Sequence, residues 1–195
     1  MMQQPVLENQ RVRLEPLTLD NYKVLETIAS EKDLIYYSPS NISTPEALLN
    51  YVKTALAEKE KDQSLPFIIY DKKLEAWAGS TRFGLIDPKN KVLHIGWTWI
   101  GNKFQRTGLN QNMKFLMLQY AFETLDYEKV DFHIDERNIK SRKAVEKLGA
   151  TLEGILRKGK LMQNGFRRNT CCYGILKEEW PKLKEQLITT ISNLE

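Results

Sequence analysis

The sequence predicts one α/β domain in which a sheet predominates and helices cover it. The 195 residues contain 42% hydrophobic and 28% charged side chains, typical of a single soluble domain with a sizeable core. Apolar and polar residues alternate over several short runs, as they do in half-buried strands. A crossover helix joins two of these runs, which predicts a parallel pair within the sheet. No repeat divides residues 1–195, so we expect one domain.

The N-terminal half is predicted to form a strand, two helices and a hairpin. Alternation in RVRLEPLT (11–18) indicates a strand, and Asp20 opens a helical run through YKVLETIA. Thr44 is a hydroxyl cap before Pro45, so a second helix begins there. The runs LPFIIYD and EAWAGSTRFGLID flank a turn and predict a hairpin, and VLHIGWTWI (92–100) predicts the next strand.

The C-terminal half continues with helices that connect further strands. Apolar residues recur every three or four positions over 110–125, which indicates a helix packed on the sheet. The strand KVDFHID (129–135) follows that helix and is therefore expected to lie parallel to its predecessor. A second helix runs from Asn138 and stops at Gly149. The strands TLEGILRK and TCCYGILK flank a polar loop, and a lysine-rich amphipathic tail follows.

Composition argues against several classes of function. The net charge of +4 comes from 29 cationic and 25 anionic side chains scattered along the chain, which disfavours a nucleic-acid surface. No apolar run reaches the roughly 18 to 20 residues of a membrane span, and the N-terminus lacks the apolar core of a signal peptide. We therefore expect a cytoplasmic protein. The cysteines, Cys171 and Cys172, are adjacent, and only His94 and His133 join them, so we expect no disulfide and no metal.

The turn GNKFQRTG (101–108) lies between a strand and a helix, where chains often bind an anion. Its backbone N–H groups approach a helix expected to start at Asn110, which could also serve as the cap. Gly108 allows close approach, and Lys103 and Arg106 add charge. A simpler alternative is a capped helix with solvated charges. The spacings of a P-loop and of a dinucleotide-binding loop are both missing.

The run Gln105-Arg106-Thr107-Gly108-Leu109-Asn110 resembles the Q/R-x-x-G-x-G/A signature of the GNAT superfamily of acyl-CoA N-acyltransferases. Two further blocks support the resemblance, N-x-x-S-x-x-A-x-x-K-L-G-A at 138–150 and RRNTCCYGILKEEW near the C-terminus. The resemblance covers nearly the whole chain. It is closest to the branch that contains Rim-type ribosomal-protein N-terminal acetyltransferases and diamine acetyltransferases.

This resemblance implies a mixed, mostly antiparallel sheet of about seven strands, with helices on both faces and a parallel central pair splayed at the cofactor site. It implies acetyl-CoA as co-substrate and no metal. The N–H of Ile100 is the candidate to polarise the acetyl carbonyl, and the hydroxyl of Ser141 is the candidate to protonate the leaving thiolate. The residues expected to bind the cofactor are Thr98, Ile100, Gln105, Arg106, Thr107, Gly108, Leu109, Asn110, Asn138, Ser141 and Arg142.

Several roles at these positions stay open. Asn138 and Ser141 stand at a helix start, where both could simply be caps. Asn110 replaces the usual glycine or alanine, and Asn112 stands where relatives often have glutamate. No carboxylate base is evident, because Lys160 occupies the position at which some relatives carry one. Water, with Glu153 or Asp87, could substitute.

The implied function is transfer of an acetyl group from acetyl-CoA to a primary amine, by direct attack through a tetrahedral intermediate. The acceptor would be a protein N-terminal α-amine or a small amine. The alternative is a catalytically weak acyl-CoA sensor or scaffold of the same fold, and a nucleotide-binding regulator is disfavoured. Relatives also suggest a homodimer.

Loops 30–45, 84–92 and 158–168 are expected to shape the acceptor site, with Tyr36, Tyr37 and Trp77 at its mouth. Trp97 and Trp99 should share a strand face opposite Thr98 and belong to the core. Cys171 and Cys172 should point to opposite faces of their strand, with one of them in the core.

Overall fold

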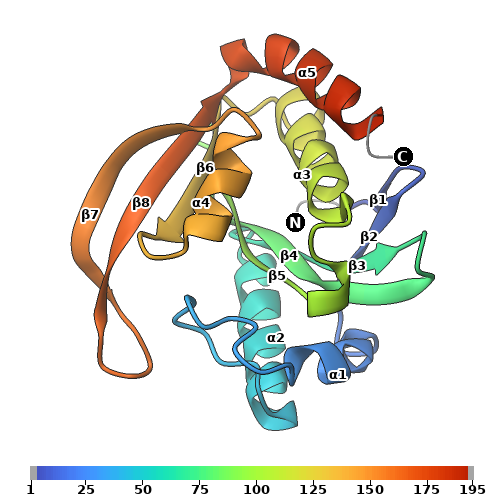
Figure 1. The fold of residues 1–195 in the computed structure, drawn as a ribbon, viewed down its shortest axis with the longest axis vertical. Helices are drawn as coiled ribbons and strands as arrows, with labels where there is room; N and C mark the ends of the chain where they lie inside the picture. Colours follow the sequence, from blue (N-terminus) through green and yellow to red (C-terminus); the bar gives the residue numbers. More distant parts are fainter. Residues whose placement is uncertain (1–3, 193–195) are drawn as a thin grey trace.

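An eight-stranded mixed sheet forms the centre of the computed structural model, which describes residues 4–192 (Figure 1). The strand order is β1-β2-β3-β4-β5-β6-β8-β7, and β5 and β6 are the parallel neighbours. The strands are β1 (Leu7–Glu8), β2 (Val12–Pro16), β3 (Leu65–Asp71), β4 (Ala76–Asp87), β5 (Val92–Ile100), β6 (Lys129–Asp135), β7 (Thr151–Leu161) and β8 (Arg167–Leu176). The predicted mixed sheet with a parallel pair is confirmed.

One strand was not expected from the sequence. The two-residue β1 pairs with β2 in the register Leu7↔Leu14. The side chain of Asn9 shapes the connection, since its Oδ1 accepts the backbone N–H groups of Arg11 and Val12, each at 2.9 Å. Two residues are too few to show a periodic pattern.

Helices cover both faces of the sheet. They are η1 (Tyr22–Leu25), α1 (Glu26–Ala29), α2 (Pro45–Glu60), η2 (Asn102–Phe104), α3 (Leu109–Gln119), the π-helical η3 (Tyr120–Thr124), α4 (Ile139–Glu146), η4 (Lys177–Glu179) and α5 (Trp180–Ser192). Two consecutive residues of β4 point to opposite faces of the sheet and contact different helices. Arg82 forms an ion pair with Glu58 of α2, whereas Thr81 contacts Met117 of α3. Within residues 4–192 no helix is long and apolar enough to cross a membrane.

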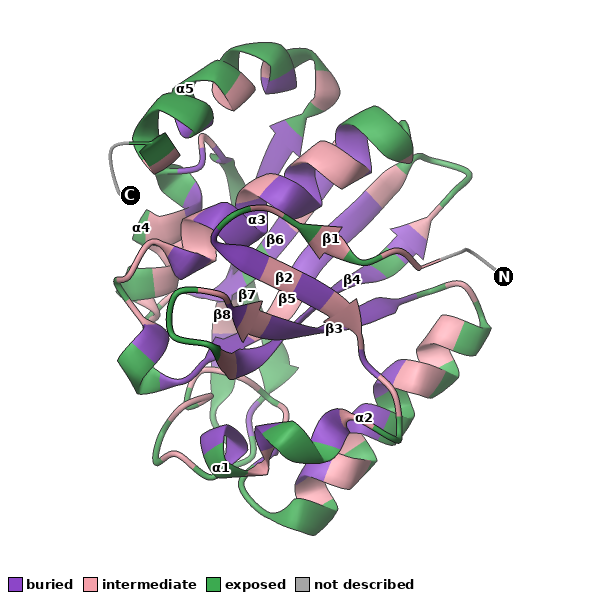
Figure 2. Cartoon of the chain, turned by 90° about the vertical axis from the view of Figure 1, so that its right-hand side faces the viewer, coloured by how far each residue is buried: buried purple, intermediate pink, exposed green. Residues whose placement is uncertain are grey.

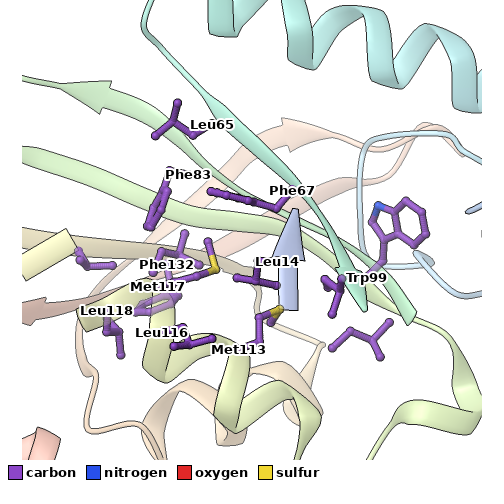
Figure 3. Packing of buried hydrophobic residues seen from close by; sticks show 14 of the residues in the cluster. Leu14, Leu65, Phe67, Phe83, Trp99, Met113, Leu116, Met117, Leu118 and Phe132 are labelled. Atoms are coloured by element: carbon purple, nitrogen blue, oxygen red, sulfur yellow. The ribbon is translucent and has the colours of Figure 1, made fainter. Parts of the chain in front are cut away.

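The main hydrophobic core lies between α3 and the sheet (Figure 3). Met113 and Met117 of α3 are fully buried there, as is Leu14 of β2. Phe67 and Phe83 meet edge to face, with ring centroids 6.1 Å apart. Burial of each such side chain contributes roughly 1.5–3 kcal/mol. Figure 2 shows this buried layer along the strands and the sheet side of α3. The core therefore fixes where the first turn of α3 stands against the strand ends.

The parallel strands part soon after they meet. β5 and β6 pair from Val92↔Lys129 to His94↔Asp131, although both strands continue beyond these pairs. A bulge in β5 accompanies the separation. Trp97 has a φ of 48°, and pairing with β4 jumps from Gly96 to Trp99. Because a bulge bends and twists its strand, it directs the end of β5 away from β6. The expected splayed pair is confirmed.

The start of α3 differs from the sequence-based expectation. Asn110 is not its cap, because the helix begins at Leu109 and Gly108 is the N-cap with a φ of 85°. Glycine adopts this left-handed conformation without the strain that a Cβ would cause. Asn110 is instead the second residue of the helix. The hairpin of β7 and β8 is also longer than expected, since its two strands extend into the predicted polar loop.

Candidate active site

The loop between β5 and α3 presents a row of free backbone N–H groups. Arg106 and Gly108 both have positive φ, at 62° and 85°. Such turns direct successive N–H groups into one concavity that suits an anion. Within the described part of the chain, the N–H groups of residues 106–111 have no protein acceptor. The positive end of the α3 dipole adds to the same site. The turn therefore presents free N–H groups as expected, and their binding of an anion stays a prediction.

A buried ion pair supports this loop from behind. The hydroxyl of Thr107 donates to the carbonyl of Phe104 at 2.7 Å and accepts from Arg11 at 3.2 Å. Arg11 forms an ion pair with Asp71, and both side chains are almost fully buried. The Thr107 side chain is thus turned toward the protein. Its backbone N–H remains free for an anion.

Asn112 anchors the other end of the loop. This side chain is only 2% exposed, and its Nδ2 donates to the carbonyl of Gly108 at 3.2 Å. Its Oδ1 accepts from Asn9 at 2.8 Å. A glutamate here would lack the amide donor and would carry a charge into a buried position. Asn112 therefore fixes the loop conformation instead of contacting an anion.

Gln105 spans the gap between the separated strands. Its Nε2 donates to the carbonyl of Ile100 at 2.7 Å, and its Oε1 accepts from Lys140 of α4. Partial burial, followed by the charge of Arg106, lowers the pKa of Lys140. Two cations therefore approach each other beside the free N–H groups. Sequence reasoning did not identify Lys140, although it lies between Asn138 and Ser141 in the N-x-x-S block.

The exposed edge of β5 faces the same gap. Gly101 donates its backbone N–H to Ala78 of β4 at 2.9 Å. Because successive N–H groups of a strand point in opposite directions, the N–H of Ile100 points away from β4 and into the gap. Thr98, two residues earlier, has the same orientation. This register agrees with the expectation that Thr98 and Ile100 face one edge.

The start of α4 brings the N-x-x-S residues close to the gap. The side chain of Asn138 caps the helix, with its Oδ1 accepting the N–H of Ser141 at 3.1 Å. Ser141 is half-buried, and its hydroxyl has no partner recorded among the described residues. Arg142 points elsewhere: its guanidinium donates to the hydroxyl of Tyr173 at 3.0 Å and to the carbonyl of Glu136 at 3.2 Å. Asn138 is thus a structural cap, and Ser141 keeps a free hydroxyl.

A buried lysine lies at the α3 side of the gap. Lys114 is 5% exposed, and its Nζ donates to Oγ1 of Thr98 at 2.8 Å. The amine also stands 5.9 Å from the ring centroid of Phe132 in β6. Burial lowers its pKa from 10.5 to about 7. Sequence reasoning missed it, although a single lysine on the apolar face of helix 110–125 was the available signal.

A cavity of about 260 Å³ lies between the segment that joins α1 to α2 and the tip of the β7–β8 hairpin. Residues from segments 29–43 and 162–164 line it together with Arg137. Tyr36 is in this lining, and the carbonyl of Tyr37 accepts from Arg168 at 2.9 Å. Two of the three predicted acceptor loops therefore meet here. Trp77 lies apart, packed edge-on against Tyr70 beside the β3–β4 turn.

The remaining candidates have structural partners. Glu153 binds Lys129 at 2.7 Å, and Asp87 accepts the backbone N–H of Asn90 at 3.0 Å. Cys171 is fully buried and Cys172 is half-buried, as their alternation predicted. Across residues 4–192, no three His, Cys, Asp or Glu side chains gather in a way that would hold a metal ion.

The two tryptophans lie on the α2 face of the sheet. Trp99 is 4% exposed and packs edge-on against Tyr51 of α2. The guanidinium of Arg82 lies 3.8 Å from the ring centroid of Trp97. Thr98 points to the other face, toward Lys114, so the predicted shared face is confirmed. Trp99 belongs to the core as expected, whereas Trp97 is only half-buried and lies outside it.

Comparison with known proteins identifies the same architecture. The model of the acetyltransferase (GNAT) domain matches residues 11–151. A Bacillus subtilis protein named "Putative ribosomal N-acetyltransferase YdaF" is 32% identical over 113 residues, which are 58% of this chain and 59% of that protein. A GCN5-related N-acetyltransferase from Brucella melitensis superposes with a TM-score of 0.89 at 28% identity, over 97% of this chain and 86% of the other.

RimJ from Mycobacterium smegmatis, solved in complex with CoA-disulfide, has a TM-score of 0.79. It is 19% identical, and the match covers 92% of this chain and 88% of RimJ. At that identity the likeness shows the shared fold alone. The resemblance to the GNAT superfamily is confirmed by the domain match, and the name of the Bacillus subtilis relative is of the kind that the expected Rim-type branch contains.

Proposed function

Because this chain belongs to the GNAT acetyltransferase family, we propose that it transfers an acetyl group from acetyl-CoA to a primary amine. The observation that carries the proposal is the row of free N–H groups at 106–111, flanked by Arg106 and Lys140. A diphosphate supplies the several anionic oxygens that such a concavity binds. The chain spans 59% of the length of the Bacillus subtilis relative, and the name of that protein does not identify the acceptor of this chain.

The residues proposed to bind acetyl-CoA come from three segments: the free edge of β5, the loop between β5 and α3, and the start of α4. The diphosphate is assigned to the N–H groups of the loop, and the pantetheine arm to the free edge of β5. The proposed set is Thr98, Ile100, Gln105, Arg106, Thr107, Gly108, Leu109, Asn110, Asn138, Ser141 and Arg142. Lys140 joins this set because of its contact with Gln105. Arg142 must leave Tyr173 to contribute.

Transfer would proceed by direct attack. The N–H of Ile100 points into the gap and would stabilise the negative charge on the carbonyl oxygen of the tetrahedral intermediate. The amine nitrogen bonds to the carbonyl carbon and gives up one proton, the bond from carbon to sulfur breaks, and the hydroxyl of Ser141 protonates the departing thiolate and then regains a proton from solvent. Ser141 is suited to this step because its hydroxyl is not used by the protein.

The cavity between segments 29–43 and 162–164 is proposed to admit the amine. Its lining holds the carboxylates of Glu31 and Asp33 and one cation, Arg137, which Asp135 already pairs at 2.8 Å, so the balance favours a cationic acceptor before deprotonation. An α-amine has a pKa of about 8 and loses its proton near neutral pH more readily than a lysine-like amine, with a pKa of about 10.4. A protein N-terminus or a small amine of similar pKa is therefore the proposed substrate class.

A sensor or scaffold that binds acyl-CoA without transfer is the second candidate. The observation that favours it is that both carboxylates considered as general bases already have protein partners. Glu153 forms an ion pair with Lys129, and Asp87 accepts a hydrogen bond from Asn90. The two functions differ in whether thiol is released when an amine is added.

A homodimer through the exposed strand β7 belongs to the same proposal. β7 is the end strand of the sheet, and every one of its residues is exposed. Leu152, Ile155 and Leu156 present apolar side chains there. Sedimentation of the purified chain should give twice the monomer mass of 22.7 kDa.

The experiment combines calorimetry with a thiol-reactive dye. The protein should bind acetyl-CoA and release thiol with peptides beginning with serine or alanine, or with a small amine of a broad panel. Gly108→Ala should weaken acetyl-CoA binding, because a side chain at a φ of 85° strains the loop by roughly 1–2 kcal/mol.

Gly159→Ala is the matched control. A Cβ at Gly159 would meet only Cβ of Leu156 at 3.8 Å, so binding should be unchanged. Absence of heat with acetyl-CoA would refute the proposal. Binding of acetyl-CoA without acetyl transfer to any amine of the panel would favour the sensor or scaffold.

A further inference from the structure

Two imidazole rings pack against each other, tilted by 38°, where β5 and β6 separate. His94 occupies the last position of β5 that pairs with β6, where it lies opposite Asp131. Its ring centroid lies 4.6 Å from that of His133 in β6. His94 is 6% exposed, whereas His133 is exposed. The pair lies on the α2 face of the sheet, because His94 is paired with Gly84, two residues after Arg82 in β4. The pair thus joins a buried imidazole to one at the surface.

The ring of His94 is directed along β5 toward the bulge. A Cβ built on Gly96 would lie 2.1 Å from Nε2 of His94, so the imidazole rests directly over the backbone of Gly96. The ring of Trp97 meets it edge-on, with centroids 5.4 Å apart. The other nitrogen, Nδ1, is buried and has no partner. The bulge that begins here leads to the Thr98 and Ile100 N–H groups that face the gap.

The surroundings keep this imidazole neutral. Burial is the main cause that lowers the pKa of His94 well below 6.5. Nearby charges act in the same direction, and they come from His133 of β6, Lys114 of α3, Arg82 of β4 and Arg168 of β8. A neutral imidazole at pH 7 can accept a proton.

His133 has a more mixed environment. Partial burial lowers the pKa of His133, and Asp131 acts against that effect. The cations that contribute are Arg168, Lys129 and Lys160. The exposed ring of His133 therefore lies between the buried imidazole and solvent, among groups that favour release of a proton.

We propose that His94 is the base that accepts the proton of the acceptor amine during acetyl transfer, and that this proton leaves to solvent on the side of the exposed His133. This role rests on the proposed acetyltransferase function. As the nitrogen–carbon bond forms, the N–H proton moves to Nε2 of His94, and the electron pair of the broken carbon–sulfur bond leaves with the thiolate. The thiolate takes up one proton, so one proton is lost and one is gained in each turnover.

The test measures kcat with the acceptor peptide or amine that the wild-type protein acetylates. His94→Gln should lower kcat about 100-fold or more, the usual contribution of a general base. Its affinity for acetyl-CoA, measured by calorimetry, should stay unchanged. His94→Ala should regain activity when imidazole is added, which a structural role would not produce.

His133→Gln should cause a smaller loss of kcat than His94→Gln. The wild-type kcat should fall as the pH drops through the lowered pKa of His94, and His94→Gln should lack this fall.

Gly96→Ala keeps the imidazole but pushes it away with a Cβ, and it should also lower kcat. Gly154→Ala, where an added Cβ meets nothing within 4 Å, is its control. If the His94 variants fail to bind acetyl-CoA, a fully active Gly96→Ala overturns the role. A wild-type rate in His94→Gln, or no rescue by imidazole in a His94→Ala that binds acetyl-CoA, also overturns it. A wild-type protein that acetylates nothing refutes the proposed function and this role together.

Discussion

Replacing Lys114 with methionine should stabilise the protein at neutral pH. Burial holds the pKa of this amine at about 7 against its ordinary 10.5, so the unfolded chain binds the proton more tightly than the folded one. Each pH unit between these values is worth about 1.4 kcal/mol, which makes the penalty at pH 7 about 4 kcal/mol. Loss of the hydrogen bond to Thr98 costs about 1 kcal/mol. The expected net gain is about 3 kcal/mol.

The sign of the pH dependence distinguishes this cause from better packing. Between the two pKa values the unfolded state binds more protons, so wild-type stability rises with pH relative to the variant. The advantage of Lys114→Met should be largest at and below pH 7 and should shrink above it. Urea unfolding from about pH 6 to pH 9 measures the difference.

Lys53→Met, at an exposed position of α2, is the control for the loss of one positive charge. Its stability should differ little from that of the wild type throughout the pH range. A gap between Lys114→Met and the wild type that does not change above pH 7 would show that burial does not depress the pKa of Lys114.

Two further variants test the supports of the loop and of α4. Asn138→Ala should lose about 1 kcal/mol of stability because the cap of α4 is missing. Thr44→Ala should lose a similar amount because the cap of α2 is missing. Only Asn138→Ala should also weaken acetyl-CoA binding, as measured by calorimetry. Equal acetyl-CoA affinities of the two variants would assign Asn138 to capping alone. Asp71→Asn leaves the buried Arg11 without its counter-charge and should cost about 3–5 kcal/mol in denaturant unfolding, and Arg11→Met in the same chain should restore part of it. A fully stable Asp71→Asn would contradict the importance of this ion pair.

Periodicity and capping predicted most of the elements because these signals act over a few neighbouring residues. Thr44 illustrates this, since its hydroxyl accepts the N–H of Ala47 at 3.1 Å, as the sequence suggested. The crossover helix was enough to predict the parallel pair β5 and β6. The prediction failed where the pattern was short, as in β1, or where polar residues continued a strand, as in the hairpin of β7 and β8. It also placed the helix cap at Asn110, because a positive φ at Gly108 gives no periodic signal.

The loop signature and the N-x-x-S block could be found in the sequence because their residues lie close together along the chain. Lys140, Lys114 and the pair of His94 and His133 could not be assigned in that way. Lys140 meets Gln105 across 35 positions, and Lys114 is buried by strands on either side of the gap. A side chain's pKa depends on the water removed and the charges brought near by distant segments. Those quantities exist only after the sheet has formed and its parallel strands have separated.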